Sequence, residues 1–509
     1  MNRRGFLTGA VSGLTLASFG RVLPARAQAG GPPPPGYVRL RVVQGELTIE
    51  GKTGKVYRIE QDDGALGWSG MRGDRFKVAV DNTVTDPFSI HWHGIILPNG
   101  QDGVPYVTQP PIKPGERRLY DFPLVQAGTY WMHSHFGLQE QSMLTAPLII
   151  REPPATPEMK EVLVMLNDFT TRDPSAILAD LRRGSMAGMQ MATGGTKTTE
   201  SGMKMSEGGM KMGGSATKTA IKADLTDVRY DALLANRRPL SDPDLTRVAP
   251  GETVRLRIIN MTSGSNVFLS TGPLGAEAIA VDGEDIVPLP GTRFELGVAQ
   301  RIDLRVRIPS GQTAYPITAQ AEGTDMLAGV VLVTAAAAVP ALSARAPKPA
   351  GALTNRQESR LRSLRPLAAK PVDHRLSVTL GGDMAAYVWS LNGQVWPKIT
   401  PFEVKQGERV ELTFVNQTMM THPMHLHGHV FQVTEVGGAR LRGAKRDTVL
   451  VSPRQTVKVE FDALYPGYWI VHCHLLYHQA AGMMTVLHYQ GFTNGSYDPL
   501  ASAAEFPRR

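Results

Sequence analysis

The sequence contains a single cysteine, Cys473, among 509 residues. A lone cysteine excludes any disulfide within the chain, so Cys473 is either a small buried apolar residue or a chemical group. Excess charge is also scarce. The formal net charge is +8, and four of the positive charges lie in the first 29 residues, which contain no acid. The remaining +4, without a run of Lys and Arg, predicts no nucleic-acid partner.

Long apolar runs are missing except for one diluted stretch near the N-terminus. Residues 6–19 are mostly apolar, but Gly, Ser and Thr interrupt them and Arg21 ends them. The stretch is short for a membrane span of about 20 residues. It follows the pair Arg3-Arg4, which resembles a twin-arginine export signal, and precedes small residues suited to cleavage near Ala27. We interpret 1–29 as a signal peptide rather than an anchor. The twin-arginine export machinery should therefore deliver the protein to the periplasm or medium, without a stable membrane anchor.

Turn-forming residues are plentiful, with 52 Gly and 37 Pro, and one pattern recurs three times. Residues 73–82, 251–260 and 407–416 all read Gly-acid-x-apolar-x-apolar-x-apolar-x-Asn. Strict alternation predicts strands with one buried face, so we expect an all-β protein built from β-sandwiches. The repeats predict three domains at 37–155, 156–338 and 372–493, with a linker rich in Ala, Pro and Arg at 339–371. We expect a monomer.

Histidine pairs are the most informative feature of the chain. Eight of the 13 histidines form four His-x-His pairs: His91/His93, His133/His135, His425/His427 and His472/His474. Residues i and i+2 of a strand face the same way, so each pair can present two imidazoles to one site. His91 and His425 both follow the Asn of their repeat by nine residues, whereas the second repeat has Leu269 there. Eight imidazoles should therefore meet between domains 1 and 3 and hold several copper or zinc ions.

The third domain adds a second group of ligand-type residues around the lone cysteine. His422 precedes His425 by three, His478 follows Cys473 by five, and Met483 follows His478 by five. Two His, one thiolate and a distant Met are the ligand set of a blue-copper electron-transfer site. A histidine on each side of Cys473 is hard to explain by packing alone.

These motifs resemble those of the multicopper oxidases. The matching segments are 91–94 (His-Trp-His-Gly), 133–135 (His-Ser-His), 422–428 (His-Pro-Met-His-Leu-His-Gly) and 472–483, which begins His-Cys-His. The resemblance spans 37–493 and implies three tandem cupredoxin-like Greek-key β-sandwich domains with four copper ions. It implies type 1 ligands His422, Cys473, His478 and Met483, and type 2 ligands His91 and His425. The two type 3 ions would take His93, His133 and His474, and His135, His427 and His472.

The resemblance also implies a route for electrons and a source of protons. Cys473 would hold the type 1 copper on one strand face, while its two neighbours hold the type 3 pair on the other. Four one-electron oxidations of small reductants would then reduce O2 to water. Asp102, just after the first pair, resembles an acid beside the type 2 copper and is a candidate proton relay. The alternative is a turn aspartate before Gly103. Some relatives carry an acid directly after the second type 1 histidine, where this chain has Gln479.

The substrate is less clear from the sequence. Residues 184–214 contain seven of the 21 methionines among Gly, Ser, Thr and Lys, which predicts a mobile loop within domain 2. Clustered thioethers suit Cu(I), although low-complexity drift is an alternative reading. Three functions remain open: an oxidase that turns Cu(I) into Cu(II) and gives copper tolerance, a laccase for phenols and aromatic amines, and a non-enzymatic copper sink. The complete ligand set argues against the sink.

Overall fold

The structure is a computed structural model that describes residues 26–153, 159–183, 225–335 and 337–494. Most of the expected signal peptide 1–29 and the whole Met-rich segment 184–214 lie outside these residues. Within them, no helix is both long and apolar enough to span a membrane. We refer to 37–155, 156–338 and 372–493 as domains 1, 2 and 3.

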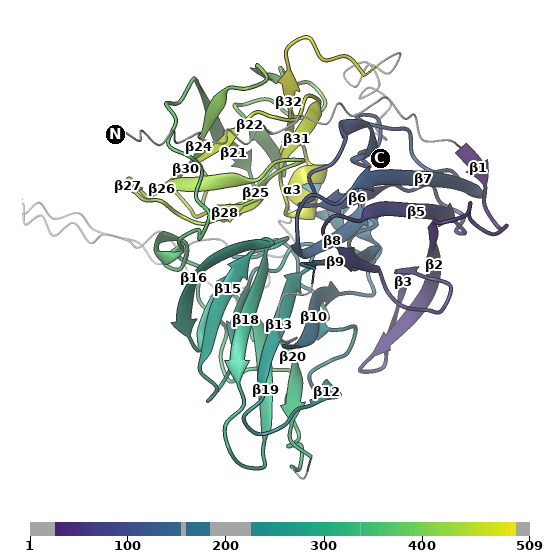
Figure 1. Ribbon diagram of the computed structural model, residues 1–509, viewed down its shortest axis with the longest axis vertical. Coiled ribbons are helices and arrows are strands. Elements are labelled where there is room, and N and C mark those ends of the chain that lie inside the picture. The colour runs from purple at the N-terminus through teal and green to yellow at the C-terminus, as the bar shows by residue number, and fades with distance from the viewer. Residues whose placement is uncertain (1–25, 154–158, 184–224, 336, 495–509) are drawn as a thin grey trace, which may run out of the picture.

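Domain 1 contains two sheets, with the orders β1-β7-β5-β2-β3 and β4-β9-β8-β6 (Figure 1). The strands are β1 (Arg26–Gln28), β2 (Val38–Ile49), β3 (Lys52–Glu60), β4 (Trp68–Met71), β5 (Arg75–Asn82), β6 (Ile90–His93), β7 (Glu116–Pro123), β8 (Gly128–Ser134) and β9 (Thr145–Arg151). The edge strand β1 belongs to the end of the expected signal peptide and pairs with β7.

Domain 2 contains sheets with the orders β11-β10-β13-β18-β15-β16 and β12-β20-β19-β14-β17. The strands are β10 (Lys160–Phe169), β11 (Ala232–Ala235), β12 (Asp244–Arg247), β13 (Thr253–Asn260), β14 (Val267–Ser270), β15 (Ala276–Val281), β16 (Glu284–Gly291), β17 (Arg293–Leu296), β18 (Arg301–Arg307), β19 (Ala314–Ala321) and β20 (Leu327–Val333).

Domain 3 contains sheets with the orders β22-β21-β24-β30-β26-β27, where β28 also pairs with β26, and β23-β32-β31-β25-β29. The strands are β21 (His374–Asp383), β22 (Val388–Leu391), β23 (Phe402–Val404), β24 (Arg409–Asn416), β25 (His422–Leu426), β26 (Phe431–Val436), β27 (Ala439–Arg440), β28 (Lys445–Arg446), β29 (Thr448–Val451), β30 (Thr456–Asp462), β31 (Tyr468–Cys473) and β32 (Met484–Tyr489).

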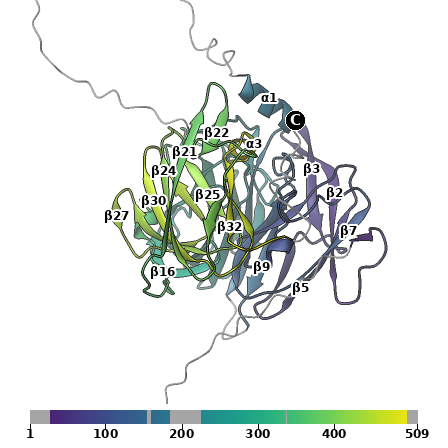
Figure 2. The same cartoon turned by 90° about the horizontal axis from the view of Figure 1, so that it is seen from above.

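Consecutive strands cross between the two sheets in each of these units. β5 and β7 lie in one sheet and β6 and β8 in the other, and the same alternation recurs at β13 to β15 and at β24 to β26. The all-β sandwich prediction is therefore confirmed. Helices are short: α1 (Pro174–Arg182), α3 (Leu476–Ala480) and the 3-10 turns η1 (Asn99–Gln101) and η2 (Glu358–Arg360). Figure 2 shows domains 1 and 3 side by side, with α3 near their boundary.

The recurring ten-residue pattern forms the strands β5, β13 and β24, and its apolar positions face the core. In β5, Phe76, Val78 and Val80 are fully buried, and each such side chain contributes roughly 1.5–3 kcal/mol. The terminal Asn has a separate role. The Asn82 Nδ2 donates to Asp86 O at 2.9 Å, and the Asn416 Nδ2 donates to Met420 O at 2.7 Å. Each amide thus fixes the turn that leads into the next strand.

The apolar cores explain how the units are held together. Most of the buried apolar side chains of domain 1 form a core of their own, whereas those of domains 2 and 3 form one continuous cluster that includes Leu361 of the linker and Trp131 and Ile149 of domain 1. Two smaller clusters join domain 1 to domains 2 and 3, respectively. The linker also contacts both domains by hydrogen bonds. Asn355 Nδ2 donates to Leu450 O of domain 3 at 2.9 Å, and the Glu295 N–H of domain 2 donates to the Gln357 side chain at 2.9 Å.

Candidate metal centre

The four His-x-His pairs lie on two equivalent pairs of strands. In domain 1, β6 runs beside β8 with His91 opposite His133. In domain 3, β25 runs beside β31 with His425 opposite His472. The second member of every pair stands at the end of its strand, as His93 does, or one residue beyond it, as His135, His427 and His474 do. Domain 2 has Leu269 on β14 at the equivalent position, where it is buried.

The two strand pairs face each other across the boundary between domains 1 and 3. The ring centroids of His91 and His427 are 3.7 Å apart, and those of His93 and His425 are 3.9 Å apart. All eight histidines are at most 5% exposed. The structure thus brings the eight imidazoles together, as expected from the sequence.

Burial lowers the pKa of seven of these imidazoles and so favours the neutral state, in which histidine binds a metal. Desolvation lowers the pKa of His472 to about 3. It also lowers the pKa of most of the other members well below the ordinary value, namely His93, His133, His135, His425, His427 and His474. Like neighbours add to the effect, because two imidazolium ions would repel each other at these distances.

Several imidazole nitrogens of the cluster are buried without a hydrogen-bond partner among the described residues. These atoms are Nε2 of His91, His133 and His425, Nδ1 of His93, and both ring nitrogens of His135 and His474. A buried polar atom without a partner costs about 1–3 kcal/mol, and eight such atoms in one place are hard to explain without a ligand. A set of neutral nitrogen donors fits copper or zinc ions.

The histidines that the resemblance assigns to each copper ion of the cluster lie close together. His93, His133 and His474 have ring centroids 4.9–5.7 Å apart. His135, His427 and His472 are all 5.2 Å from one another, and their ligand atoms lie within 4.8 Å of one another. The centroids of His91 and His425 are 5.8 Å apart.

A second group surrounds Cys473, on the far side of β31. The Cys473 Sγ lies 3.6 Å from His422 Nδ1 and 3.7 Å from His478 Nδ1, and the two nitrogens are 3.2 Å apart. All three side chains are fully buried, as is Met483, whose carbonyl accepts the Cys473 N–H at 3.1 Å. Burial raises the pKa of the Cys473 thiol, so a metal that binds here must displace its proton.

Outer contacts fix which nitrogen each of these histidines offers. His422 Nε2 is 2.7 Å from Thr418 Oγ1, and His478 Nε2 is 2.7 Å from Asp227 Oδ2. Both Nδ1 atoms are therefore left to face Cys473. The indole of Trp389 stacks on the His478 ring at 3.8 Å. Asp227 and Trp389 were not expected from the sequence, because neither lies near the ligand motifs.

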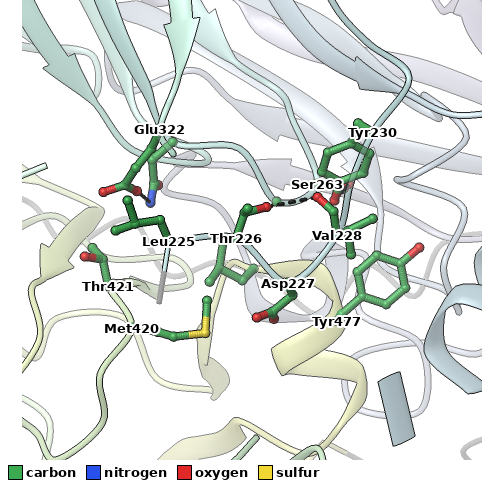
Figure 3. A pocket seen from close by; sticks show the side chains of 13 residues that line it. Leu225, Thr226, Asp227, Val228, Tyr230, Ser263, Glu322, Met420, Thr421 and Tyr477 are labelled. Carbon is green, nitrogen blue, oxygen red and sulfur yellow. Dashed lines mark hydrogen bonds between the residues drawn. The ribbon is translucent and has the colours of Figure 1, made fainter. Parts of the chain in front are cut away.

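Asp227, which contacts His478, belongs to domain 2 and lines a small cavity (Figure 3). The cavity has a volume of about 20 Å³, and the side chains of Glu322, Met420 and Tyr477 also line it. The Tyr387 hydroxyl donates to the same Asp227 Oδ2 at 2.5 Å. The outer edge of His478 therefore meets a carboxylate rather than open solvent.

Three buried carboxylates surround the eight-histidine cluster, and each contacts one histidine of domain 1 and one of domain 3. Asp102 Oδ1 is 3.2 Å from His91 Nδ1, and its Oδ2 is 2.9 Å from His427 Nδ1. The predicted Asp102 thus lies at the cluster, fully buried.

The other two carboxylates were missed from the sequence. Glu140 Oε2 is 2.9 Å from His133 Nδ1, and Oε1 is 3.8 Å from His474 Nδ1. Burial raises the pKa of Glu140 well above the ordinary value. Asp447 Oδ1 is 3.1 Å from His93 Nε2 and 3.7 Å from His425 Nδ1.

A large cleft reaches the cluster from outside. Its volume is about 1160 Å³, and its lining includes His135, Leu476 and Gln479 with residues of α1. It gives small molecules a way to the imidazole of His135. The three histidines without an expected role have other side-chain partners: His488 pairs with Glu403, and His374 is 3.6 Å from Glu408. His429 lies next to the cluster, because its Nδ1 is 2.8 Å from the His427 carbonyl, but its Nε2 contacts the Tyr489 hydroxyl.

Comparison with known proteins agrees with this geometry. Family models described as multicopper oxidase match residues 65–155, 160–339 and 370–491. The chain belongs to the multicopper oxidase family. It is accordingly an oxidoreductase that uses O2 as electron acceptor and copper as cofactor.

Among its relatives is the multicopper oxidase MmcO of Mycobacterium tuberculosis, which is 33% identical over 82% of this chain and 80% of that protein. Copper resistance protein A of Escherichia coli is 28% identical over 82% and 86%, respectively. Among solved structures, Fet3p matches with a TM-score of 0.70 at 20% identity, covering 92% of this chain and 93% of that one. The laccase from Botrytis aclada also gives 0.70, at 22% identity and 92% and 90% coverage. These structural matches support the cupredoxin fold.

Proposed function

We propose that this protein is an exported cuprous oxidase for copper tolerance, with one type 1, one type 2 and two type 3 copper ions. The observation that carries the copper assignment is the set of unpartnered, buried imidazole nitrogens between domains 1 and 3, next to a separate Cys473 site. The ligand assignment is the one implied by the sequence motifs. When bound, the coppers take electrons singly from the substrate and deliver four of them to dioxygen, which becomes water.

The chain connects the two sites through three consecutive residues. Cys473 faces His422 and His478, while its neighbours His472 and His474 turn to the other face of β31 and join the cluster. An electron that enters near His478 thus has a covalent path of a few bonds to the cluster. The cleft that reaches His135 shares no lining residue with the Asp227 cavity, so dioxygen can approach the cluster away from that cavity.

The reduction of dioxygen also needs protons. The Asp102 carboxylate accepts a hydrogen bond from His427 Nδ1, the Asp102 carbonyl accepts one from His91 Nδ1, and the side chain is fully buried. Asp102 is therefore the candidate proton relay at the cluster. No acid follows His478, since Gln479 stands there. Glu140 is the other buried carboxylate of domain 1 that contacts the cluster.

Cu(I) is the proposed substrate for two reasons. Two relatives that match 82% of this chain are named copper resistance protein A and copper resistance protein A homolog. The described residues on both sides of the Met-rich segment 184–214 also lie beside α3: Arg182 Nη2 donates to Ala480 O at 3.2 Å, and Asp227 contacts His478. Thioethers prefer Cu(I) to Cu(II). The segment is therefore attached where it can supply copper to the electron-entry side.

The alternative function is a laccase that acts mainly on phenols and aromatic amines, as the likeness to proteins named laccase suggests. The proposed location, the periplasm or the medium after twin-arginine export, suits either substrate. A non-enzymatic copper sink is the third reading.

Deletion of 184–214 distinguishes the first two functions. We expect Cu(I) oxidation at low copper to fall several-fold, while phenol oxidation stays level or rises. A same-length control replaces the seven methionines with leucine, which keeps apolar bulk and removes the thioethers: Met186, Met189, Met191, Met203, Met205, Met210 and Met212. It should behave like the deletion. Unchanged Cu(I) kinetics in both folded, copper-loaded variants would leave the laccase as the better assignment.

A further inference from the structure

Domain 2 supplies no histidine to the cluster, yet one of its side chains lies directly behind it. Arg301, the first residue of β18, is fully buried at the point where the three domains meet. Its guanidinium forms a two-point contact with Asp447 of domain 3, at 2.8 Å to Oδ1 and 2.5 Å to Oδ2. Its Nε donates to Thr129 O of domain 1 at 3.1 Å. A single side chain thus binds all three domains.

Asp447, which Arg301 holds, contacts two members of the cluster, one through its carboxylate and one through its backbone carbonyl. Asp447 Oδ1 accepts from His93 Nε2 at 3.1 Å, and the Asp447 carbonyl accepts from His425 Nδ1 at 2.8 Å. The second nitrogen of each ring, Nδ1 of His93 and Nε2 of His425, has no hydrogen-bond partner in the described part of the chain. The contacts therefore decide which nitrogen faces the cluster in one histidine from each domain.

The close fit at Gly94 supports the same conclusion independently. Gly94 follows His93 and has φ +81°, and a Cβ built there would lie 2.4 Å from Asp447 Oδ2 and 2.6 Å from Arg301 Nη2. The ion pair therefore packs against the backbone of the His-x-His-Gly segment. Arg301 is in turn fixed by Asp282, whose Oδ1 accepts the Arg301 N–H at 2.9 Å.

We propose that Arg301 of domain 2 is a positioning residue for the copper cluster, which it assembles by fixing Asp447 against His93 and His425. The ligand-free domain then does more than separate domains 1 and 3, since it completes the outer contacts of the cluster. This inference rests on the proposed copper assignment of the eight histidines. Loss of an outer partner of a metal-binding histidine typically weakens metal binding by about 10- to 100-fold.

The test compares copper retention in Arg301→Met, Arg301→Lys and the parent. Each copper-loaded protein is titrated with a chelator, with the blue absorbance reporting type 1 copper and electron paramagnetic resonance reporting type 2 copper. For Arg301→Met we expect half of the cluster copper to leave at about 10- to 100-fold lower chelator concentration. The type 1 absorbance should be lost at the same chelator concentration as in the parent protein. Arg301→Lys, which keeps the charge but not the two-point contact, should fall between them.

Arg255→Met is the matched control. Arg255 is another arginine of domain 2 with a buried aspartate partner, Asp303, at 2.5 Å, but it does not contact Asp447. It should release cluster copper like the parent. Equal retention of cluster copper in Arg301→Met and the parent would overturn the proposal, as would parallel loss of type 1 and cluster copper, which indicates general destabilisation.

Asp447→Asn covers the case in which Arg301→Met does not fold, since it keeps the volume of the side chain and Arg301 itself. The same early loss of cluster copper is expected, and parent-like retention would overturn the proposal. A parent protein without blue colour would instead refute the proposed function. The two failures are therefore distinguishable.

Discussion

Replacement of Asp102 by Asn tests the proton supply of the cluster most directly. The carboxylate accepts from His427 Nδ1 at 2.9 Å, and its other oxygen lies 3.2 Å from His91 Nδ1, which hydrogen-bonds the Asp102 carbonyl at 2.9 Å. An amide has one oxygen and one NH2 group. It therefore either keeps its oxygen at His427 and places NH2 beside His91, or loses the hydrogen bond to His427. Loss of a hydrogen bond to a charged group costs about 1.5–3 kcal/mol. Loss of a general acid–base group typically costs about 10²- to 10⁴-fold in rate.

The assay separates the two half-reactions by stopped flow. With excess reductant and no oxygen, bleaching of the type 1 absorbance should proceed at the parent's rate, because Cys473 and its partners do not contact Asp102. Addition of dioxygen to the reduced protein should then give reoxidation slower by about 10²- to 10⁴-fold. The comparison is made at equal copper content, so that any loss of metal is not read as a loss of proton transfer.

A buried carboxylate elsewhere provides the control for this variant. Asp168 in domain 2 accepts from Ser263 and Gly264 backbone N–H groups and contacts no histidine. Asp168→Asn should therefore leave both half-reactions at the parent's rates, even where it lowers stability. Reoxidation of Asp102→Asn at the parent's rate would refute the relay and leave Asp102 as a turn residue before Gly103.

Two further predictions concern the lone thiol and a buried acid of domain 2. Cys473→Ser should lose the blue colour and oxidase turnover while keeping cluster copper by metal analysis, and turnover at the parent's rate would contradict the type 1 assignment. Burial raises the pKa of Glu322 to about 7, so the folded chain keeps this proton at a pH where the unfolded chain has lost it. Its contribution to stability is present below the unfolded value and is lost as the pH rises through about 7. In the copper-free protein, we therefore expect the thermal midpoint of Glu322→Gln to rise relative to that of the parent as the pH goes from 5 to 8, by the equivalent of up to about 3 kcal/mol. A difference that stays constant over this range would argue against the raised pKa.

Local patterns account for what the sequence could predict. The alternation in 73–82, 251–260 and 407–416 is a property of single strands, and all three form strands β5, β13 and β24. The histidine pairs were recognisable because the residue type is rare and the spacing of two matches a strand. The equal offset from the repeat placed pairs of domains 1 and 3 at equivalent positions, and their rings do meet.

The outer contacts could not be predicted, because their meaning arises only when distant segments come together. Asp447 and His93 are 354 positions apart, and Asp227 and His478 are 251 apart. The sequence contains 46 acidic residues, and neither Asp447 nor Asp227 has a neighbouring sequence pattern that marks it as the partner of a histidine. Glu140 offered the one usable signal, since it follows His135 by five residues in a stretch that is otherwise uncharged. The position in the sequence where some relatives carry an acid is occupied by Gln479, and it lies far along the chain from Glu140.

The charges around the cluster suggest a division of roles among its three carboxylates. Asp447 is compensated by Arg301, whereas no Lys or Arg of the described residues forms an ion pair with Asp102 or Glu140. A buried carboxylate without a cation is costly, and burial raises the pKa of Glu140 accordingly. Metal ions or protons would bring positive charge to the cluster. This charge offsets the cost of burial at Asp102 and Glu140, because neither has a Lys or Arg partner within the described ranges. Asp447 therefore suits a fixed, positioning role, whereas Asp102 and Glu140 have no such fixed counter-charge beside them in the part of the chain that the structure describes.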